Sequence, residues 1–281
     1  MQQCISPGRT SAMDNKLERK QAIFAKRNAE IVKVKGKGKI DYINPLPEGK
    51  KVYYTVHLQY FIKQKDFFYI EEEREKRQGL FYKGVLIEDE EVPISFASEE
   101  IGFSEEEVPA EEEEMHKDRS YTYDRLKAVQ YAERWWNSYN PAYKKFEVDC
   151  TNYISQCVHA GGGQMHGYPN RNKGWWMQNN NWSYSWSVAN AFPRYLASST
   201  KGLRAKEVKN ATELLLGDVI CYDFQGDGKY DHTTIVTGKD ENGEPLVNAH
   251  TYNSRMRYWK YEDSSAYTPN IRYRFFTIVN N

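Results

Sequence analysis

The stretch FEVDCTNYISQC at residues 146–157 decides how the second half of this chain folds, because a polar loop gives way there to an apolar helical repeat. The repeat continues to about residue 160, and the three glycines at residues 161–163 are typical of a helix end. Cys150 therefore stands in the first turn of a predicted helix. The unpaired backbone N–H groups of such a turn carry partial positive charge, which favours a thiolate. This position makes Cys150 the candidate nucleophile.

The other cysteines do not share this position. The four cysteines stand at positions 4, 150, 157 and 221, in a chain too long to need a disulfide framework. Cys157 lies in the middle of the same predicted helix and is expected to be inert, and Cys221 is a weaker candidate because it alternates with apolar residues in a predicted strand. The chain has no Cys-x-x-Cys pair, and the spacing of Cys150, His159 and His166 matches no ligand pattern for zinc. We predict no metal and no cofactor.

The amino-acid composition limits the classes of protein to which this chain can belong. The 281 residues suffice for one large domain or two modest ones, and 40% hydrophobic residues suffice for a core. Lys plus Arg and Asp plus Glu both number 39, so no overall charge points to a nucleic acid or an anionic membrane as partner. No apolar run reaches the roughly 20 residues of a membrane span, and residues 1–20 lack the apolar centre of a secretory signal. A cytoplasmic location is expected, and the oligomeric state stays open.

Three segments follow one another along the chain. Residues 15–34 carry an amphipathic pattern that predicts a helix, and residues 51–63, 66–77 and 79–92 alternate as strands do. A helix laid across a small antiparallel sheet is therefore predicted for a domain over residues 1–100. Residues 101–119 are predicted to be an acidic linker, because the seven Glu and one Asp between positions 105 and 118 cannot pack together. Residues 120–281 form the second predicted domain.

The second domain is predicted to begin with a helix that is capped by Asp124 and ends before Pro141, followed by the helix that opens at Cys150. A long polar and aromatic loop then leads to a short helix at residues 188–196. The segments GDVICYDF, DHTTIVTG, PLVNAHT and IRYRFFTIV predict successive antiparallel strands, with a turn at Asn242 and Gly243. The predicted fold class is α+β, with the nucleophile helix packed on a small antiparallel sheet.

A nucleophilic cysteine needs a base, and a third group must fix the tautomer of that base. His232 opens the predicted strand HTTIVTG, where its side chain can face a neighbouring helix end. If the hairpin turn is centred between residues 242 and 243, His250 lies one diagonal step from His232, and Asn248 is the alternative orienter on the same face. The predicted triad is Cys150, His232 and either His250 or Asn248.

The segments DCTNYISQCVHAGG, LLLGDVICYDF, DHTTIVTG and NAHT occur in this order and resemble the bacterial putative amidase domain, over residues 123 to about 279. That family is a branch of the papain-like cysteine peptidases and is related to cell-wall endopeptidases. The resemblance implies a helix-carried cysteine on a small antiparallel sheet, with a histidine from one strand and a polar residue from the next. By position it makes Cys150 the nucleophile, His232 the base and His250 the orienter, and it gives Asp149 a structural role at the helix entry.

The predicted activity is cysteine-dependent hydrolysis of an amide bond. Attack by the Cys150 sulfur gives an oxyanion that the Cys150 backbone amide stabilises, His232 protonates the leaving amine, and water releases the thioester. The expected substrate is a peptide, and the related domains imply a peptidoglycan stem peptide. Trp175, Trp176 and Trp186 are predicted to line its groove, with packing in the core as the competing interpretation.

Two other interpretations stay open. A binding module for peptides or glycans would keep the fold and the aromatic groove without turnover, although such a module has no use for a cysteine and two histidines together. An acyltransferase would discharge the thioester to an amine instead of water, and the sequence does not separate it from a hydrolase.

Overall fold

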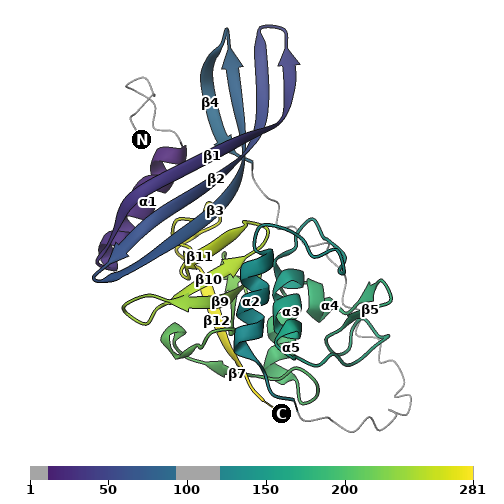
Figure 1. The fold of residues 1–281 in the computed structure, drawn as a ribbon. Coiled ribbons are helices and arrows are strands. Elements are labelled where there is room, and N and C mark those ends of the chain that lie inside the picture. The colour runs from purple at the N-terminus through teal and green to yellow at the C-terminus, as the bar shows by residue number, and fades with distance from the viewer. Residues whose placement is uncertain (1–11, 93–120, 281) are drawn as a thin grey trace.

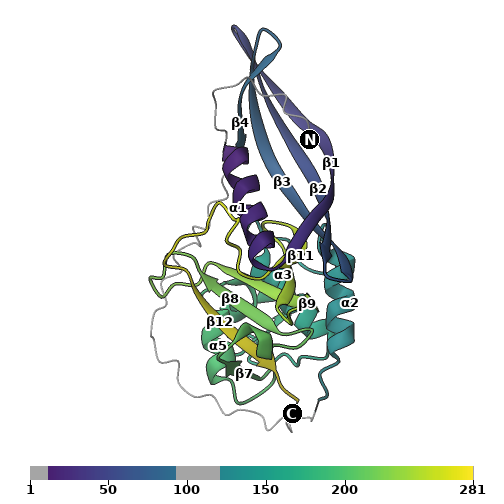
Figure 2. The same ribbon diagram turned by 90° about the vertical axis from the view of Figure 1, so that its left-hand side faces the viewer.

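The structure is a computed structural model that describes residues 12–92 and 121–280. Its fold is α+β, as predicted, and is organised around one antiparallel sheet in which β1-β2-β3-β11-β10-β9-β8-β12-β7 are neighbours and β4 also pairs with β3. Figures 1 and 2 show a long twisted ribbon of N-terminal strands that continues into the body of the molecule. The strands of this sheet are β1 (Ala29–Leu46), β2 (Gly49–Gln64), β3 (Phe67–Tyr82), β4 (Val85–Glu91), β7 (Ala205–Val208), β8 (Val219–Asp223), β9 (His232–Lys239), β10 (Pro245–Ala249), β11 (Ser254–Tyr258) and β12 (Arg272–Ile278).

Five α-helices are present among the described residues. Two of them, α2 and α3, contribute to the candidate site and lie on one face of the sheet in the second half of the chain (Figure 1). A short 3₁₀ turn, η1, and a two-stranded hairpin, β5 and β6, complete the connections. The helices and connections are α1 (Ala12–Lys26), α2 (Arg125–Trp135), α3 (Cys150–Ala160), α4 (Tyr184–Ser187), α5 (Phe192–Ser198), η1 (Ala211–Glu213), β5 (Met177–Gln178) and β6 (Asn181–Trp182).

The N-terminal helix is shorter than predicted. α1 ends at Lys26, and Asn28 adopts the left-handed conformation with φ 54°, so the chain turns and β1 begins at Ala29. The predicted helix over residues 15–34 is therefore wrong beyond Lys26, because the apolar residues that follow serve strand pairing instead. Phe24 of α1 packs with buried residues of β2 and β3, which gives the predicted arrangement of one helix across an antiparallel sheet.

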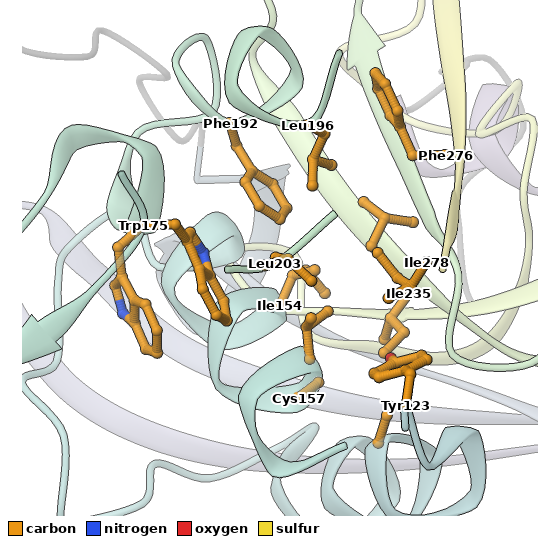
Figure 3. Packing of buried hydrophobic residues seen from close by; sticks show 14 of the residues in the cluster. Tyr123, Ile154, Cys157, Trp175, Phe192, Leu196, Leu203, Ile235, Phe276 and Ile278 are labelled. Atoms are coloured by element: carbon orange, nitrogen blue, oxygen red, sulfur yellow. The ribbon is translucent and has the colours of Figure 1, made fainter. Parts of the chain in front are cut away.

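In the second half, several predicted boundaries are confirmed. The side chain of Asp124 accepts a hydrogen bond from the Lys127 backbone N–H at 3.0 Å and so caps α2. α3 spans the predicted residues and ends at Gly161. Figure 3 shows the core that α3 forms with the sheet, in which Ile154 and Cys157 lie among residues of α5, β9 and β12. The predicted helix at residues 188–196 begins later, at Phe192, and continues to Ser198 as α5, whereas the short helix α4 precedes the predicted range.

The two halves of the chain are joined within the sheet. Ser254 and Arg255 of β11 pair with Glu73 and Glu72 of β3, so the N-terminal strands and the C-terminal strands form one continuous sheet. The predicted linker at residues 101–119 lies outside the described residues, and the predicted division into domains stays a prediction.

A buried cluster of charges supports this junction. The ammonium group of Lys20, on α1, is hydrogen-bonded to Glu71 and Glu73 of β3 and lies 2.8 Å from Asp263 Oδ2, which belongs to the second half. Arg257 of β11 binds Asp263 at 2.8 Å. All five residues are at most 3% exposed, so the charged groups among them are compensated within the cluster and not by water. Across residues 12–92 and 121–280, no helix is both long and apolar enough to cross a lipid bilayer.

Candidate functional site

The entry to α3 is held by two polar side chains. Oδ1 of Asp149 accepts hydrogen bonds from the Phe146 backbone N–H and from the Asn152 side chain, both at 2.9 Å. Oγ1 of Thr251 accepts from the backbone N–H groups of Asp149 and Cys150, both at 3.1 Å. The predicted structural role of Asp149 takes this form: its carboxylate orders the loop before the helix, whereas Thr251 satisfies the first N–H groups.

Thr251 has a strained backbone. Its φ is 76°, in the left-handed region that a β-branched residue rarely adopts. Such strain costs about 1–3 kcal/mol and is typical of functional sites. Thr251 directly follows His250 and binds the N–H of Cys150, so it connects two predicted site residues. The sequence carried no signal for this role, because the position was predicted only as the end of a strand.

The Cys150 thiol is covered in this structure. Its side chain is buried, and Sγ lies 3.8 Å from Oγ1 of Thr151. Burial raises the pKa of Cys150 above its ordinary value, and this effect outweighs the hydrogen bonds from Thr151 and Thr233 that lower it. The expected thiolate at the helix start is therefore not favoured here, because burial of the sulfur disfavours its charged form. Cys157 and Cys221 are also buried free thiols with raised pKa values, as befits core residues.

His232 lies on the other face of the sheet. Oγ1 of Thr233 is 3.1 Å from Oγ1 of Thr151, so Thr233 faces α3. Successive side chains of a strand point to opposite faces, and the His232 ring therefore packs on the far side against Tyr222 and Tyr261, with ring centroids 5.6 and 5.4 Å away. Burial lowers the pKa of His232 to about 3. The structure does not bring His232 to Cys150, and its role as base stays a prediction.

His250 and Asp149 form a buried pair on the α3 side of the sheet. Nδ1 of His250 lies 2.9 Å from Oδ2 of Asp149, and Nε2 lies 2.7 Å from the carbonyl oxygen of Trp135. Because a carbonyl oxygen only accepts, Nε2 carries a proton. A second proton then lies between Nδ1 and Asp149. Tyr153, one helical turn after Asp149, stacks on the imidazole with 3.9 Å between ring centroids and fixes its plane.

Asn248, the alternative orienter, is engaged elsewhere. Its Oδ1 accepts from the Thr237 hydroxyl at 2.8 Å and from the Met256 N–H at 2.9 Å, and its Nδ2 donates to Glu133 at 2.8 Å. In the hairpin, Asn248 pairs with Ile235, because the turn spans Asp240 to Glu244 and a bulge interrupts the ladder. The predicted register, which centred the turn between residues 242 and 243, is therefore wrong. Asn248 therefore ties β9, β10, β11 and α2 together.

A small hollow, with a volume of about 10 Å³ and so room for about one water molecule, lies beside the Asp149–His250 pair and opens to solvent. Its wall comes from the end of α2, the segment before α3, and the first two turns of α3. Lys144 and Lys145 give it positive charge, and their ammonium groups also lie over the rings of Trp182 and Tyr139. The lining residues are Trp135, Ser138, Tyr139, Asn140, Tyr143, Lys144, Lys145, Asp149, Asn152, Gln156 and His250.

The three tryptophans predicted to bind substrate lie in the core. Trp175, Trp176 and Trp186 are at most 1% exposed. The indole N–H groups of two of them donate to α3: Trp175 to Ser155 and Trp186 to Asn152, both at 2.9 Å. These contacts support the helix that carries Cys150. A substrate-binding role stays a prediction, and it would require these rings to become uncovered.

The comparisons with known proteins define the class. Residues 122–276 match the family described as "Putative amidase domain", and the chain belongs to that family. The chain is 52% identical to the "Uncharacterized protein YhbB" of Bacillus subtilis (strain 168) over 268 residues, which cover 94% of this chain and 86% of that protein. It is 32% identical to the "Uncharacterized protein YjcM" of the same strain over 140 residues, which cover 47% and 31% of the two chains. No solved structure matches.

Proposed function

We propose that this chain hydrolyses amide bonds, with the start of α3 as reaction centre and Cys150 as nucleophile. One observation carries the proposal: Cys150, the Asp149–His250 pair and the strained Thr251 converge at a single helix end beside a hollow. Membership of the amidase family supports the class of reaction. The resemblance to papain-like cysteine peptidases supports the choice of a cysteine nucleophile.

In this proposal His250, and not His232, transfers the proton. His250 lies on the same face of the sheet as α3, and the adjacent Asp149 orients its ring and stabilises its positive charge. To take the thiol proton, the imidazole must first lose its Nε2 proton to solvent, which breaks the hydrogen bond to the Trp135 carbonyl and leaves Nε2 with a free lone pair. His250 would then return the proton to the leaving amine, and water would release the thioester.

The described conformation is closed, and reaction requires an opening at Thr251. The backbone N–H of Cys150, which an oxyanion would use as donor, is bound to the Thr251 hydroxyl. Moving Thr251 away would free that donor. The strain at φ 76° already destabilises the closed arrangement and so lowers the free energy needed for this movement.

A second candidate function is a binding module without turnover. It is favoured by the covered Cys150 thiol with its raised pKa, since such a thiol is protonated at neutral pH. In that case the hollow beside His250 would bind a peptide or glycan whose amide bonds stay intact.

For the substrate we propose a peptide, and specifically a stem peptide of peptidoglycan. The support for the stem peptide is the resemblance to cell-wall endopeptidases. Lys144 and Lys145 at the hollow suit the carboxylates that such peptides carry.

The test is release of new amino groups from stem peptides by the full chain and by three variants. Cys150→Ser and His250→Gln should each lower turnover by at least 100-fold, whereas His232→Phe, which keeps an aromatic ring in its pocket, should retain it. Circular dichroism controls for folding. Loss of turnover in His232→Phe alone would contradict the role of His250. Binding of the peptide without any turnover would favour the second candidate.

A further inference from the structure

The outer edge of β1 is long and has no strand partner within the described part of the chain. β1 is the first strand in the order of the sheet, and its other side pairs along its whole length with β2. Its 18 residues make it the longest strand, and its upper part extends away from the body of the molecule (Figures 1 and 2). An edge of this kind presents free N–H and C=O groups that can pair with another strand.

One face of β1 carries a row of lysines. Lys33, Lys35, Lys37 and Lys39 occupy alternate positions and are all exposed. The pairing with β2 is regular from Lys33 to Ile40, between two register shifts, so the four ammonium groups point to the same face at intervals of about 7 Å. Among residues 12–92 and 121–280, no carboxylate forms an ion pair with any of the four.

Two acidic groups on the same face have partners within their own sheet. Asp41 accepts a hydrogen bond from the Thr55 hydroxyl at 2.7 Å, and Glu72 is paired with Arg255 at 2.9 Å. Neither carboxylate forms an ion pair with a lysine of the row.

The opposite face of the same stretch is apolar and partly exposed, beside the place where α1 packs on β2. Val34 and Ile40 are 37% and 60% exposed, and Gly36 and Gly38 between them add no side chain. Side chains that pair across neighbouring strands lie on the same face. A strand added along this edge would therefore meet positive charge on one face and apolar surface on the other.

Protection of the sheet edge against pairing with other strands does not by itself account for this pattern. Lysines on an edge strand oppose pairing with another copy of β1, because like charges would then face each other. The same row favours a strand of opposite charge, so repulsion of one partner and attraction of another come from the same four residues. Protection of the edge against strand pairing does not explain why the apolar side chains of Val34 and Ile40 are exposed there.

We propose that the edge of β1 between Lys33 and Ile40 binds an extended acidic segment of another protein, which joins the sheet as an added strand. The segment would carry carboxylates at alternate positions facing the lysines and β-branched apolar residues between them facing Val34 and Ile40. Backbone hydrogen bonds would supply affinity and the alternating side chains specificity. This binding does not depend on turnover at Cys150.

The site is connected to the candidate hollow through the sheet. Across the sheet Lys37 pairs with His57, which pairs with Arg74, and Nη1 of Arg74 donates to the Asn137 carbonyl at 3.1 Å. Ser138, the next residue, lines the hollow. A partner bound at β1 would therefore be connected to the hollow only through β2, β3 and the Arg74 contact.

The test uses a fluorescent eight-residue peptide of alternating Glu and Val, titrated with the full-length chain at low and at physiological salt. Replacement of Lys33, Lys35, Lys37 and Lys39 by Gln should weaken binding about tenfold or more, since four cross-strand charge pairs are lost. The matched control replaces the exposed Lys173, Lys206, Lys209 and Lys229 by Gln and should leave Kd unchanged. Cys150→Ala should also bind normally, which separates this proposal from the proposed hydrolysis.

Three further ligands and one further variant decide between occupants. A peptide with N-methyl groups on alternate amides should not bind if strand pairing is the mode. Equal binding of a block Glu–Val peptide, or of a single-stranded oligonucleotide, would overturn the proposal in favour of unspecific attraction of negative charge. Binding that appears only after residues 105–107 and 111–114 are changed from Glu to Gln would overturn it as well, because the occupant is then this chain's own acidic stretch. No peptide binding, with self-association of the lysine variant, would leave edge protection as the role.

Discussion

Glu71 in the buried charge cluster makes a prediction about pH. Burial, together with the neighbouring Glu73 and Asp263, raises the pKa of Glu71 from 4.5 to about 7, despite the opposing effect of Lys20. The folded chain therefore holds a proton on Glu71 that the unfolded chain releases. The stabilisation from this proton is fully present below about pH 4.5 and is lost as pH rises through about 7. At about 1.4 kcal/mol for each pKa unit, the loss amounts to about 3 kcal/mol.

The perturbation is Glu71→Gln, which keeps the shape and cannot titrate. Urea unfolding followed by tryptophan fluorescence at pH 5, 6, 7 and 8 gives the free energy of unfolding for both proteins. The free energy of the wild type relative to the variant should fall by about 2–3 kcal/mol between pH 5 and pH 8. Glu88→Gln, at an exposed site on β4, should follow the wild type at every pH. Parallel curves for the wild type and Glu71→Gln would refute the reasoning, because Glu71 would then be ionised in the folded chain throughout.

Three substitutions test other parts of the fold, each by the free energy of unfolding. Thr251→Val keeps the shape and the strain but leaves two backbone N–H groups at the start of α3 without their acceptor, and should destabilise by about 2 kcal/mol, whereas Thr251→Ser should not destabilise. Asp124→Ala should cost about 1 kcal/mol through loss of the cap on Lys127, and an unchanged value would mean that water replaces the cap. Gly174→Ala should destabilise by several kcal/mol, because φ is 66° and a Cβ would lie 1.9 Å from the His166 carbonyl oxygen; wild-type stability would contradict this close approach.

Local signals predicted the elements that carry the site. The helix that opens at Cys150 and stops at Gly161 follows from a helical repeat and a terminal glycine, and Asp124 caps α2 as its side chain suggests. β8 and β9 were recognisable from uninterrupted apolar and β-branched runs. These features depend on a few neighbouring residues, which a sequence displays directly.

Such local signals could not predict which face of the sheet a side chain occupies or how neighbouring strands are registered. A period of two puts His232 and Thr233 on opposite faces, but only the contact between Thr233 and Thr151 decides which of them faces α3. The register observed between β9 and β10 differs from the predicted one, because the turn before Glu244 is longer than two residues. β11 was missed because Arg255 and Arg257 give it little apolar alternation, and its charges are compensated by distant acidic residues of β3, of α2 and of the segment after β11.

The pairing of β3 with β11 also bears on how this chain can be divided in the laboratory. A fragment limited to residues 122–276, the region that matches the family, would lack the N-terminal strands. β11 would then be an unpaired edge strand of the remaining sheet. Arg257 would lose the carboxylate of Glu73, and Asp263 would lose Lys20. In such a fragment, side chains that are buried at the junction would be exposed to solvent. Assays of the isolated region would therefore describe a destabilised protein.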